Sequence, residues 1–482
     1  MASKTFSRIW LLILLIMMSV SSLTQSSNAK VIPNAYIVQV ADTADVHQVA
    51  NTVARFTGGN MRHVYTKALW GFAIRVPAGI KKADILAHAG VVLVEPDLEI
   101  TIFNQTLPTG VDRIGVDLNN TAKIDGIDER VDVDIAIIDT GIDGDHPDLN
   151  VFTGVNFSTG APSWDDGHGH GTHVAGITAA LDNDIGVVGI APGARLWAVK
   201  VLKETGVSFL SSAIAGVDWV TQNADQIEVA NMSIGATGTS DSFRTAIQNS
   251  IAAGVVYVVA AGNDSEDVYG NDGIFNTSDD TIPAAYPEVA TISAMADSDG
   301  QPGGTGSSTS YGSDDSFASF SNFSETVVAD NPVTSPGAAI DLLMPGVNIY
   351  STWKDGGYNT ISGTSMSSPH GAGLAALYIA EYGRATDAND VCAIRQALID
   401  SGMVQDGLRG LSTLNDPDAN WENIGYYIPG DFNYDGVVYF EDLAILALYW
   451  IEDVPSIDIA PLGRDGIINF LDFALFAENW MQ

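Results

Sequence analysis

The chain has 482 residues, too many for one ordinary domain, and 46% of them are hydrophobic, which excludes a disordered protein. Its 59 acidic residues against 21 basic ones give a formal net charge of −38 at pH 7, which argues against nucleic acid or an anionic membrane as a partner. A solvated acidic surface, calcium binding and a salty medium all fit this charge. The single Cys392 excludes an intramolecular disulfide bond and is expected to be a buried structural thiol.

Residues 1–29 have the pattern of a secretory signal peptide. Lys4 and Arg8 precede the apolar run IWLLILLIMM, and a serine-rich stretch ending in SSNA follows. This run is too short to span a bilayer, and the small residues after it suit signal cleavage. We therefore expect a secreted, extracellular protein, with no membrane association after the signal is removed.

A small unit is expected within residues 30–105. Strands are predicted at residues 36–40, 61–66, 69–76 and 91–97, and helices at residues 45–56 and 81–88. This β-α-β-β-α-β order is typical of a two-layer mini-domain. Its histidines are scattered, so no catalytic cluster is predicted there.

A larger α/β unit is expected in residues 106–403. Runs rich in β-branched residues at 133–139, 194–202, 228–234, 254–263 and 288–294 alternate with helical segments such as 172–181, 211–223 and 242–253. Buried strands that alternate with helices predict a parallel sheet covered on both faces. Because active sites of such sheets lie at the carboxyl ends of strands, Asp139 and Asn263 mark the expected site.

A serine in the segment GTSMSSPHGAG is the candidate nucleophile. Ser365 follows Gly-Thr at a turn that opens a helix, where backbone N–H groups can receive an oxyanion. Taken alone, such a turn is most often only a helix start. Two earlier segments, IAIIDTGID with Asp139 and GHGHGTHVAG with His170, supply the acid and the base that a serine nucleophile needs.

The ordered segments DTGID, HGTHVAG, AAGN and GTSMSSPH resemble those of the subtilisin-type serine peptidases, over about residues 107–403. The resemblance implies a three-layer α/β fold with a parallel central sheet and secreted endopeptidase activity on proteins or peptides. It also implies that Ser365 attacks the scissile carbonyl, His170 transfers the proton and Asp139 orients the imidazole. His170 stands first in HGTH, whereas His173 is expected to pack and His168 to be exposed in a loop.

The same resemblance implies further site residues. Asn263 corresponds to the side-chain donor to the oxyanion. Ser233, Ile234 and Gly235 in NMSIG correspond to the segment that pairs with the backbone of an extended substrate. Such pairing favours broad specificity.

A calcium site is also implied in this region, formed by oxygen atoms of two sequence segments. The expected ligands are the side chains of Asp148 and Asn183 and the carbonyls of Leu181, Ile185 and Val187. An ordinary Asn/Asp turn is the alternative.

The N-terminal unit resembles the inhibitory propeptides of this family, which assist folding, block the active site and are then removed. The cut is expected between about residues 99 and 109. The chain would therefore be made as a zymogen.

Two stretches are inserted relative to a minimal subtilisin. Residues 264–281 are acidic, so a second calcium loop through Asp272, Asp279 or Asp280 is one interpretation and a solvated loop the other. Residues 297–315 are rich in glycine and serine and are expected to form a flexible excursion.

Residues 404–427 are expected to form a linker, followed by a repeat in residues 428–482. DGVVYFEDLAILALYW and DGIINFLDFALFAENW align without a gap at a spacing of 30 residues. In the first copy, acidic and amide residues alternate before Gly436 with EF-hand spacing. The second loop departs from this spacing. The candidate ligands for calcium are Asp431, Asn433, Asp435, Val437, Asp442, Asp458, Asp465, Asn469 and Asp472.

The repeat resembles a dockerin, a small α-helical, EF-hand-like module that binds two calcium ions and a cohesin domain. A cohesin-bearing scaffold protein is therefore an expected partner. The alternative is a calcium-stabilised helical pair whose Leu443, Leu446, Phe473 and Phe476 form its own core. For the whole chain, the alternative to a peptidase is a catalytically silent binding protein that works through this tail.

Overall fold

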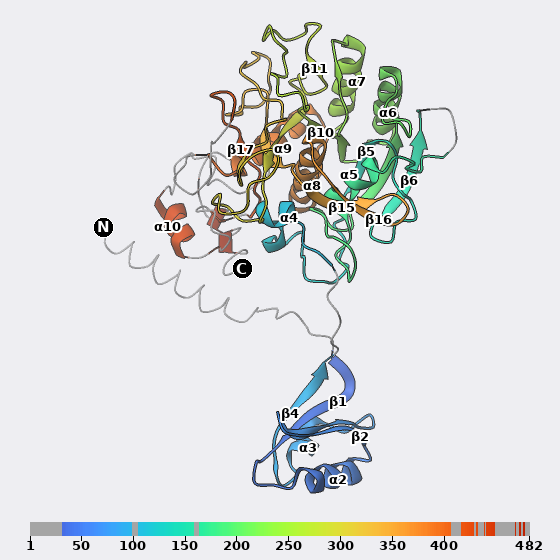
Figure 1. Ribbon diagram of the computed structural model, residues 1–482, viewed down its shortest axis with the longest axis vertical. Helices are drawn as coiled ribbons and strands as arrows, with labels where there is room; N and C mark the ends of the chain where they lie inside the picture. The colour runs from blue at the N-terminus through green and yellow to red at the C-terminus, as the bar shows by residue number, and fades with distance from the viewer. Residues whose placement is uncertain are drawn as a thin grey trace, which may run out of the picture. The chain divides into compact units, whose positions relative to one another are not determined.

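The computed structural model describes residues 31–98, 105–158, 163–405, 416–428, 430–431, 438, 440–448, 468, 472–473 and 476–477. The chain divides into two compact units, one up to Ile102 and one from Phe103 onward (Figure 1). The expected signal peptide lies outside the described residues. Among the described helices, none is both long and apolar enough to cross a membrane.

The first unit is a four-stranded antiparallel sheet with strand order β2-β3-β1-β4 and two helices. Its elements are β1 (Val31–Val40), α2 (Val46–Thr57), β2 (Asn60–Thr66), β3 (Trp70–Arg75), α3 (Lys82–Leu86) and β4 (Val91–Leu98). Helix α2 begins where the Asp45 side chain accepts the Gln48 N–H, and ends at the left-handed Gly58. The buried side chains of Val38, Val53, Phe72 and Ile85 form a core within the unit. The predicted β-α-β-β-α-β order is therefore present.

The second unit is built on a sheet with strand order β17-β14-β12-β10-β8-β5-β7-β6, in which every neighbouring pair is parallel. These strands are β5 (Asp134–Asp139), β6 (Val151–Asn156), β7 (Arg195–Lys200), β8 (Val229–Met232), β10 (Val256–Ala260), β12 (Ala290–Ala296), β14 (Leu342–Pro345) and β17 (Asn423–Ile424). The edge strand β13 (Ser316–Phe317) pairs antiparallel with β12. The sequence prediction of a parallel sheet is confirmed.

Helices cover both faces of this sheet. The described helices of this unit are α4 (Thr109–Arg113), α5 (His170–Ala179), α6 (Leu210–Gln222), α7 (Asp241–Ala252), α8 (Thr364–Tyr382), α9 (Ala388–Ser401) and α10 (Phe440–Leu448), together with the 3₁₀ turn η1 (Val116–Leu118). Short ribbons β9 (Ala236–Thr237) with β11 (Thr281–Ile282), and β15 (Ile349–Trp353) with β16 (Gly357–Ile361), complete the unit.

The alternation of side chains along β5 determines which helix packs on which face. A Cβ atom on Gly171 of α5 would lie 3.1 Å from the Cβ of Asp139, and one on Gly216 of α6 would lie 3.6 Å from Ile138. Neighbouring strand residues point to opposite faces, so α5 and α6 lie on opposite sides of the sheet. Helix α8 packs beside α5, and α7 packs beside α6. Asp139 therefore points toward the α5 and α8 layer.

Residues after 403 join the second unit rather than standing apart from the sheet. Asn423 and Ile424, in the segment expected as a linker, form β17 and pair with β14. The buried Val438, Leu446 and Phe476 of the C-terminal repeat share an apolar cluster with residues such as Ile424. Leu443 and Phe473 pack partly buried against the same cluster, which also contains Leu343 of β14, so these apolar residues do not form a core of the repeat alone.

Candidate active site

Asp139 and His170 are joined by a hydrogen bond at the carboxyl end of β5. Asp139 is the last residue of the strand and is fully buried. The Nδ1 atom of His170, the first residue of α5, lies 2.8 Å and 2.9 Å from the two Asp139 carboxylate oxygens. A carboxylate facing Nδ1 holds the proton on that nitrogen and leaves Nε2 able to accept another.

Asp166 organises the loop that places His170 at the start of α5. One of its buried oxygens accepts the N–H groups of His168 and Gly169 and the Thr140 hydroxyl, and the other accepts the N–H and hydroxyl of Thr172. Gly169 has a φ of +108° and leaves no room for a side chain against Trp353. Sequence analysis missed Asp166, because an Asp in a polar loop carries no signal of its hydrogen-bond partners.

Charges around His170 favour its protonated form. Burial lowers the pKa of the imidazole, but the charge and hydrogen bond of Asp139, together with the charge of Asp166, outweigh burial and raise the pKa above its usual 6.5. His173 differs, because burial lowers its pKa to about 3. The His173 Nε2 lies 3.1 Å from the carbonyls of Ile349 and Asn359, so this ring is a neutral structural donor, as expected from its place in the helix.

Ser365 is held against the loop that follows β8. Its hydroxyl donates to the Ser233 carbonyl at 3.2 Å, and the Ser233 hydroxyl donates to the Ser365 carbonyl at 2.8 Å. The Ser365 carbonyl accepts this side-chain donor because Pro369, four residues on, has no N–H to offer. Asn231 and Ser368 continue this buried network.

Asn263 is held by the residue before the nucleophile. The Thr364 N–H donates to the Asn263 Oδ1 at 2.8 Å, and the Thr364 hydroxyl donates to the same oxygen at 3.1 Å. Because an N–H can only donate, the amide oxygen must face Thr364 and the Nδ2 amino group must point away from it. The Asn263 Nδ2 makes no hydrogen bond to any residue in the described part of the chain. The site thus has a pre-oriented donor at the start of α8.

A groove of about 450 Å³ lies beside these residues. Its walls include the expected substrate-binding residues Ser233, Ile234 and Gly235, and also His170. Sequence analysis missed two further lining residues, Val207 and Phe209. It expected His168 to be exposed in a loop, whereas His168 is half-buried and lines the groove. Val207 and Phe209 are 65% and 70% exposed, so they offer apolar surface to a ligand. In the sequence, nothing except its closeness to His170 indicates a role for His168 in the site.

Several of the residues expected to bind calcium lie together around Asp148. Asp148 is fully buried, and its carboxylate accepts hydrogen bonds from the Asn183 Nδ2, the Val187 N–H and the Tyr358 hydroxyl. Burial without a basic partner raises its pKa to about 6. The chemistry of this donor set therefore fits a hard cation.

Gln105 joins this group and was missed by sequence analysis. Its Nε2 lies 2.7 Å from the Leu181 carbonyl and 3.1 Å from the Val187 carbonyl. The Thr106 N–H donates to the Gly186 carbonyl, which ties residues 105–106 to the loop. Ile185 donates its N–H to the Asn183 Oδ1 at 2.7 Å. The pairing joins segments about 80 residues apart, so no local pattern reveals it.

Three of the candidate ligands in the C-terminal repeat belong to the described residues. Asp431, Asp442 and Asp472 are all buried, and the Asp431 carboxylate accepts the Tyr426 hydroxyl. The other candidates, Asn433, Asp435, Val437, Asp458, Asp465 and Asn469, lie outside the described residues.

Comparison with known proteins places this site in a large family. The family described as the subtilase family, Peptidase_S8, matches residues 131–420. Subtilisin DY of Bacillus licheniformis is 38% identical over 278 residues, which are 58% of this chain and 86% of the relative. Subtilisin E of Bacillus subtilis strain 168 is 35% identical over 306 residues, which are 63% of this chain and 69% of the relative. The solved structure of a cold-adapted subtilisin-like serine proteinase is 30% identical, with a TM-score of 0.48, and covers 66% of this chain and 98% of its own.

The family match covers all strands of the parallel sheet except β17, and it includes α5, α8 and the segments that carry Asp139, His170 and Ser365. The expected fold, a subtilisin-like α/β fold with a parallel central sheet, is confirmed. The chain belongs to the subtilase family and is a subtilisin-like serine endopeptidase.

Proposed function

We propose that the enzyme hydrolyses peptide bonds through Asp139, His170 and Ser365, with Asn263 as a donor to the oxyanion. The observation that carries this proposal is the Asp139–His170 pair, at 2.8 Å, beside the groove that Ser233 lines. Ser365 contacts Ser233 at that same place. In a free enzyme the hydrogen bond from the serine to the histidine is often long and tightens when substrate binds.

In the first half of the reaction, the Ser365 Oγ forms a bond to the carbonyl carbon of the substrate while its proton passes to the His170 Nε2. The carbonyl oxygen becomes an oxyanion, which receives the Asn263 Nδ2–H and the N–H of Ser365 at the start of α8. His170 then gives its proton to the leaving amine as the C–N bond breaks. An acyl-enzyme and a free amine result.

In the second half, a water molecule takes the place of the amine. Its proton passes to the His170 Nε2 as its oxygen bonds to the acyl carbon, and the same donors receive the second oxyanion. The proton returns to the Ser365 Oγ as the ester bond breaks. Asp139 stays ionised throughout and stabilises the imidazolium in both halves.

We expect an extended peptide to pair with the backbone of residues 233–235 by hydrogen bonds, which do not depend on the side chains of the substrate. Val207 and Phe209 add exposed apolar surface along the groove. Apolar side chains on the substrate are therefore expected to be preferred. A panel of peptides that differ at one position tests this, and equal kcat/KM for leucine and aspartate at every position would contradict it.

Labelling with a fluorophosphonate tests the nucleophile directly. Wild type should be labelled, and Ser365→Ala should not. The matched control is Ser362→Ala, three residues before, where the hydroxyl accepts only the Asn348 N–H, and this variant should be labelled like wild type. Absence of label on wild type, or equal label on Ser365→Ala, would instead favour the catalytically silent binding protein.

The N-terminal unit is proposed to be an inhibitory propeptide of a secreted zymogen. Its own apolar core and its separation from the second unit at about Ile102 support removal as one piece. N-terminal sequencing of secreted wild type should find a start between about residues 99 and 109. Ser365→Ala should keep the unit attached, and processing of this variant to the same start would show that another peptidase makes the cut.

Calcium is proposed to bind at Asp148, Asn183, the carbonyls of Leu181, Ile185 and Val187, and Gln105. When bound, the ion would neutralise the buried Asp148 carboxylate and link residues 105–106 to the loop. A chelator should lower the melting temperature of wild type, and by less in Asp148→Asn. Asp145→Asn, an exposed neighbour, should respond like wild type.

The C-terminal repeat is proposed to bind calcium and to serve as a docking module. The side chains of Asp431, Asp442 and Asp472 support the first part, since they are buried and offer carboxylate oxygens, which calcium prefers as ligands. A pull-down of full-length Ser365→Ala with a cohesin domain, with and without calcium, tests the docking role. If the protein does not bind the cohesin domain in either condition, the docking role is contradicted and only the packing of the repeat in its apolar cluster remains.

A further inference from the structure

The loop between β12 and β13 is folded around acidic side chains. Asp314 accepts the N–H and hydroxyl of Ser298 and the N–H of Gly306, at 2.7 to 2.9 Å. Asp315 accepts the N–H groups of Gly303 and Gly304. The glycine- and serine-rich stretch, expected to be a flexible excursion, is thus organised by two carboxylates near its end.

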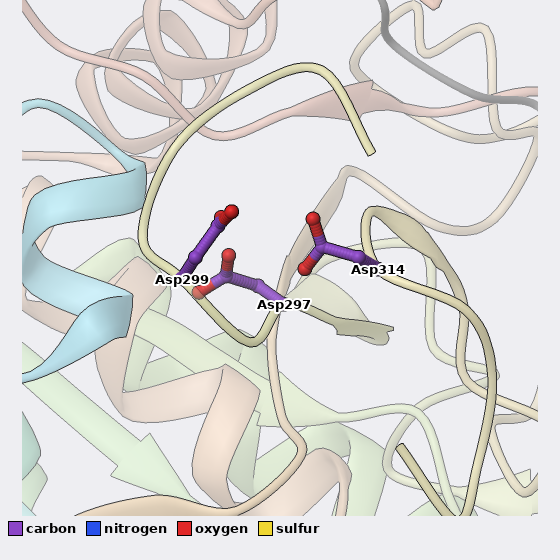
Figure 2. Close-up of side chains that lie close together, drawn as sticks. All are labelled: Asp297, Asp299 and Asp314. Atoms are coloured by element: carbon purple, nitrogen blue, oxygen red, sulfur yellow. The ribbon is translucent and has the colours of Figure 1, made fainter. Parts of the chain in front are cut away.

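Three carboxylates of this loop face one another. Asp297, Asp299 and Asp314 each offer one oxygen, and these oxygens all lie within 4.8 Å of one another. Figure 2 shows Asp297 and Asp299 on one arm of the loop and Asp314 on the other, with their carboxylates turned toward a common space. Oxygens that ligate one calcium ion at about 2.3 to 2.6 Å lie within about 5 Å of one another. The spacing therefore matches the coordination sphere of that ion.

A second observation at this place points to a ligand. Asp297 is only 2% exposed, and its Oδ2 has no hydrogen-bond partner, while its Oδ1 accepts the Gly300 N–H at 3.0 Å. Burying a carboxylate oxygen without a partner costs free energy, because the oxygen loses its hydration and gains no hydrogen bond or cation in return. The Asp297 carboxylate is turned toward Asp299 and Asp314 (Figure 2), where a cation would supply the missing partner.

The charges nearby compensate this group only in part, although the charge of Arg113 acts on Asp297 as well. Arg113 of α4 is the buried basic side chain beside the loop, and its Nε donates to Asp315 at 2.7 Å. Asp112, next to it, adds a further carboxylate, which accepts the Gln301 Nε2 at 3.0 Å. The guanidinium neutralises one carboxylate of the region and leaves a net negative charge.

We propose that Asp297, Asp299 and Asp314 bind a calcium ion, separate from the one expected at Asp148. All three side chains offer only oxygen, which hard cations prefer and zinc or copper do not. The ion would join the two arms of the loop and fix the loop beside α4, where Gln301 meets Asp112. Magnesium is less suited, since its ligands must lie closer, at about 2.0 to 2.1 Å in octahedral geometry.

Calcium content of the full-length protein tests this site. In a Ser365→Ala background, which prevents self-cleavage, equilibrium dialysis against calcium should find one ion fewer per chain in Asp297→Asn and in Asp299→Asn than in the parent. Asp225→Asn, at an exposed carboxylate outside every candidate calcium site, should bind as many ions as the parent. Asp148→Asn should lose a different ion, so that Asp148→Asn with Asp299→Asn loses two. Equal calcium content in the parent and both loop variants would overturn the proposal.

Amide hydrogen exchange tests the site in a second way, which does not depend on the number of calcium ions bound per chain. Adding calcium should slow amide exchange at residues 298–306 at least 10-fold in the parent, whereas magnesium at the same concentration should not. The exposed Asp299 makes Asp299→Asn the variant that should fold, and its exchange should be insensitive to calcium. If Asp297 is simply protonated, Asp297→Asn will keep the loop protected without calcium, and that result would also overturn the proposal.

Discussion

Ser233 and Ser365 exchange two hydrogen bonds, each through its hydroxyl to the other's carbonyl, at 2.8 Å and 3.2 Å. One bond fixes the backbone that carries the nucleophile, and the other holds the nucleophilic hydroxyl itself. The residue that starts the substrate-binding segment therefore also positions the nucleophile. This pairing depends on Pro369, whose missing N–H leaves the Ser365 carbonyl open to a side-chain donor.

Ser233→Ala should destabilise the protein and reduce kcat. The Ser365 carbonyl loses its donor inside the protein, which costs about 1 to 3 kcal/mol of the free energy of unfolding. The displaced nucleophile should lower kcat more than it changes KM. Urea unfolding in the Ser365→Ala background, and steady-state kinetics with Ser365 present, measure the two effects.

A second substitution separates the lost hydrogen bond from other causes. Pro369→Ala restores a backbone N–H that can donate to the Ser365 carbonyl within α8. The double variant Ser233→Ala with Pro369→Ala should therefore lose less stability than the sum of the two single changes. Strict additivity would show that the Ser233 hydroxyl does not act through that carbonyl.

Asn263→Ala should lower kcat by about 10²- to 10³-fold with little change in KM, a magnitude established for the equivalent donor of subtilisin and carried over from it. The amide is oriented by Thr364 and donates only when the oxyanion forms, so binding of the substrate should hardly change. Asn271→Ala, in the following loop, is the matched control. A proportional rise in KM would indicate a role in substrate binding instead.

The pH dependence of kcat/KM should report the pKa of His170. Asp139 and Asp166 raise this pKa, so activity should be lost as pH falls through a value above 6.5, where the base becomes protonated. Asp139→Asn should lower kcat by about 10⁴-fold. It should also move the remaining acid limb of the pH profile to lower pH, because the charge of Asp139 is lost and only the charge of Asp166 then opposes the effect of burial. An unmoved limb would assign the titration to another group.

Glu422 should make the free energy of unfolding fall as the pH rises toward 8. Burial, with the charge of Asp416 adding to it, raises its pKa to about 8, and the Ser293 hydroxyl donates to its carboxyl group. The folded state then holds a proton that the unfolded state has lost above about pH 4.5, so stability is greatest at low pH and is lost up to the folded-state pKa.

Glu422→Gln removes this titration while it keeps the shape of a neutral carboxyl group. The variant should be more stable than the parent at pH 9 and should differ little from it at pH 5. Chemical unfolding of both in the Ser365→Ala background measures this, with the exposed Glu129→Gln as a control. A parent whose stability is flat from pH 5 to pH 9 would rule out a protonated Glu422.

Much of the fold was predictable, because hydrophobic periodicity is a local property. The strands and helices of the first unit, and the strands that carry Asp139 and precede Asn263, lie where the pattern predicts them. The segment around residue 423 was expected to be a linker, yet it forms β17. A strand of two residues is too short to show a hydrophobic period in the sequence, so its pairing with β14 could not be predicted.

By itself, the sequence determined the family, the order of the elements and the candidates Asp139, His170, Asn263 and Ser365, because short ordered motifs carry that information. The tertiary structure alone decided what these residues touch. The bond from Thr140 to Asp166, the bonds between Ser233 and Ser365 and the bond from Arg113 to Asp315 join residues 26, 132 and 202 positions apart along the chain. Such partners follow from how the sheet and its loops pack, and packing depends on the whole chain rather than on any window of it.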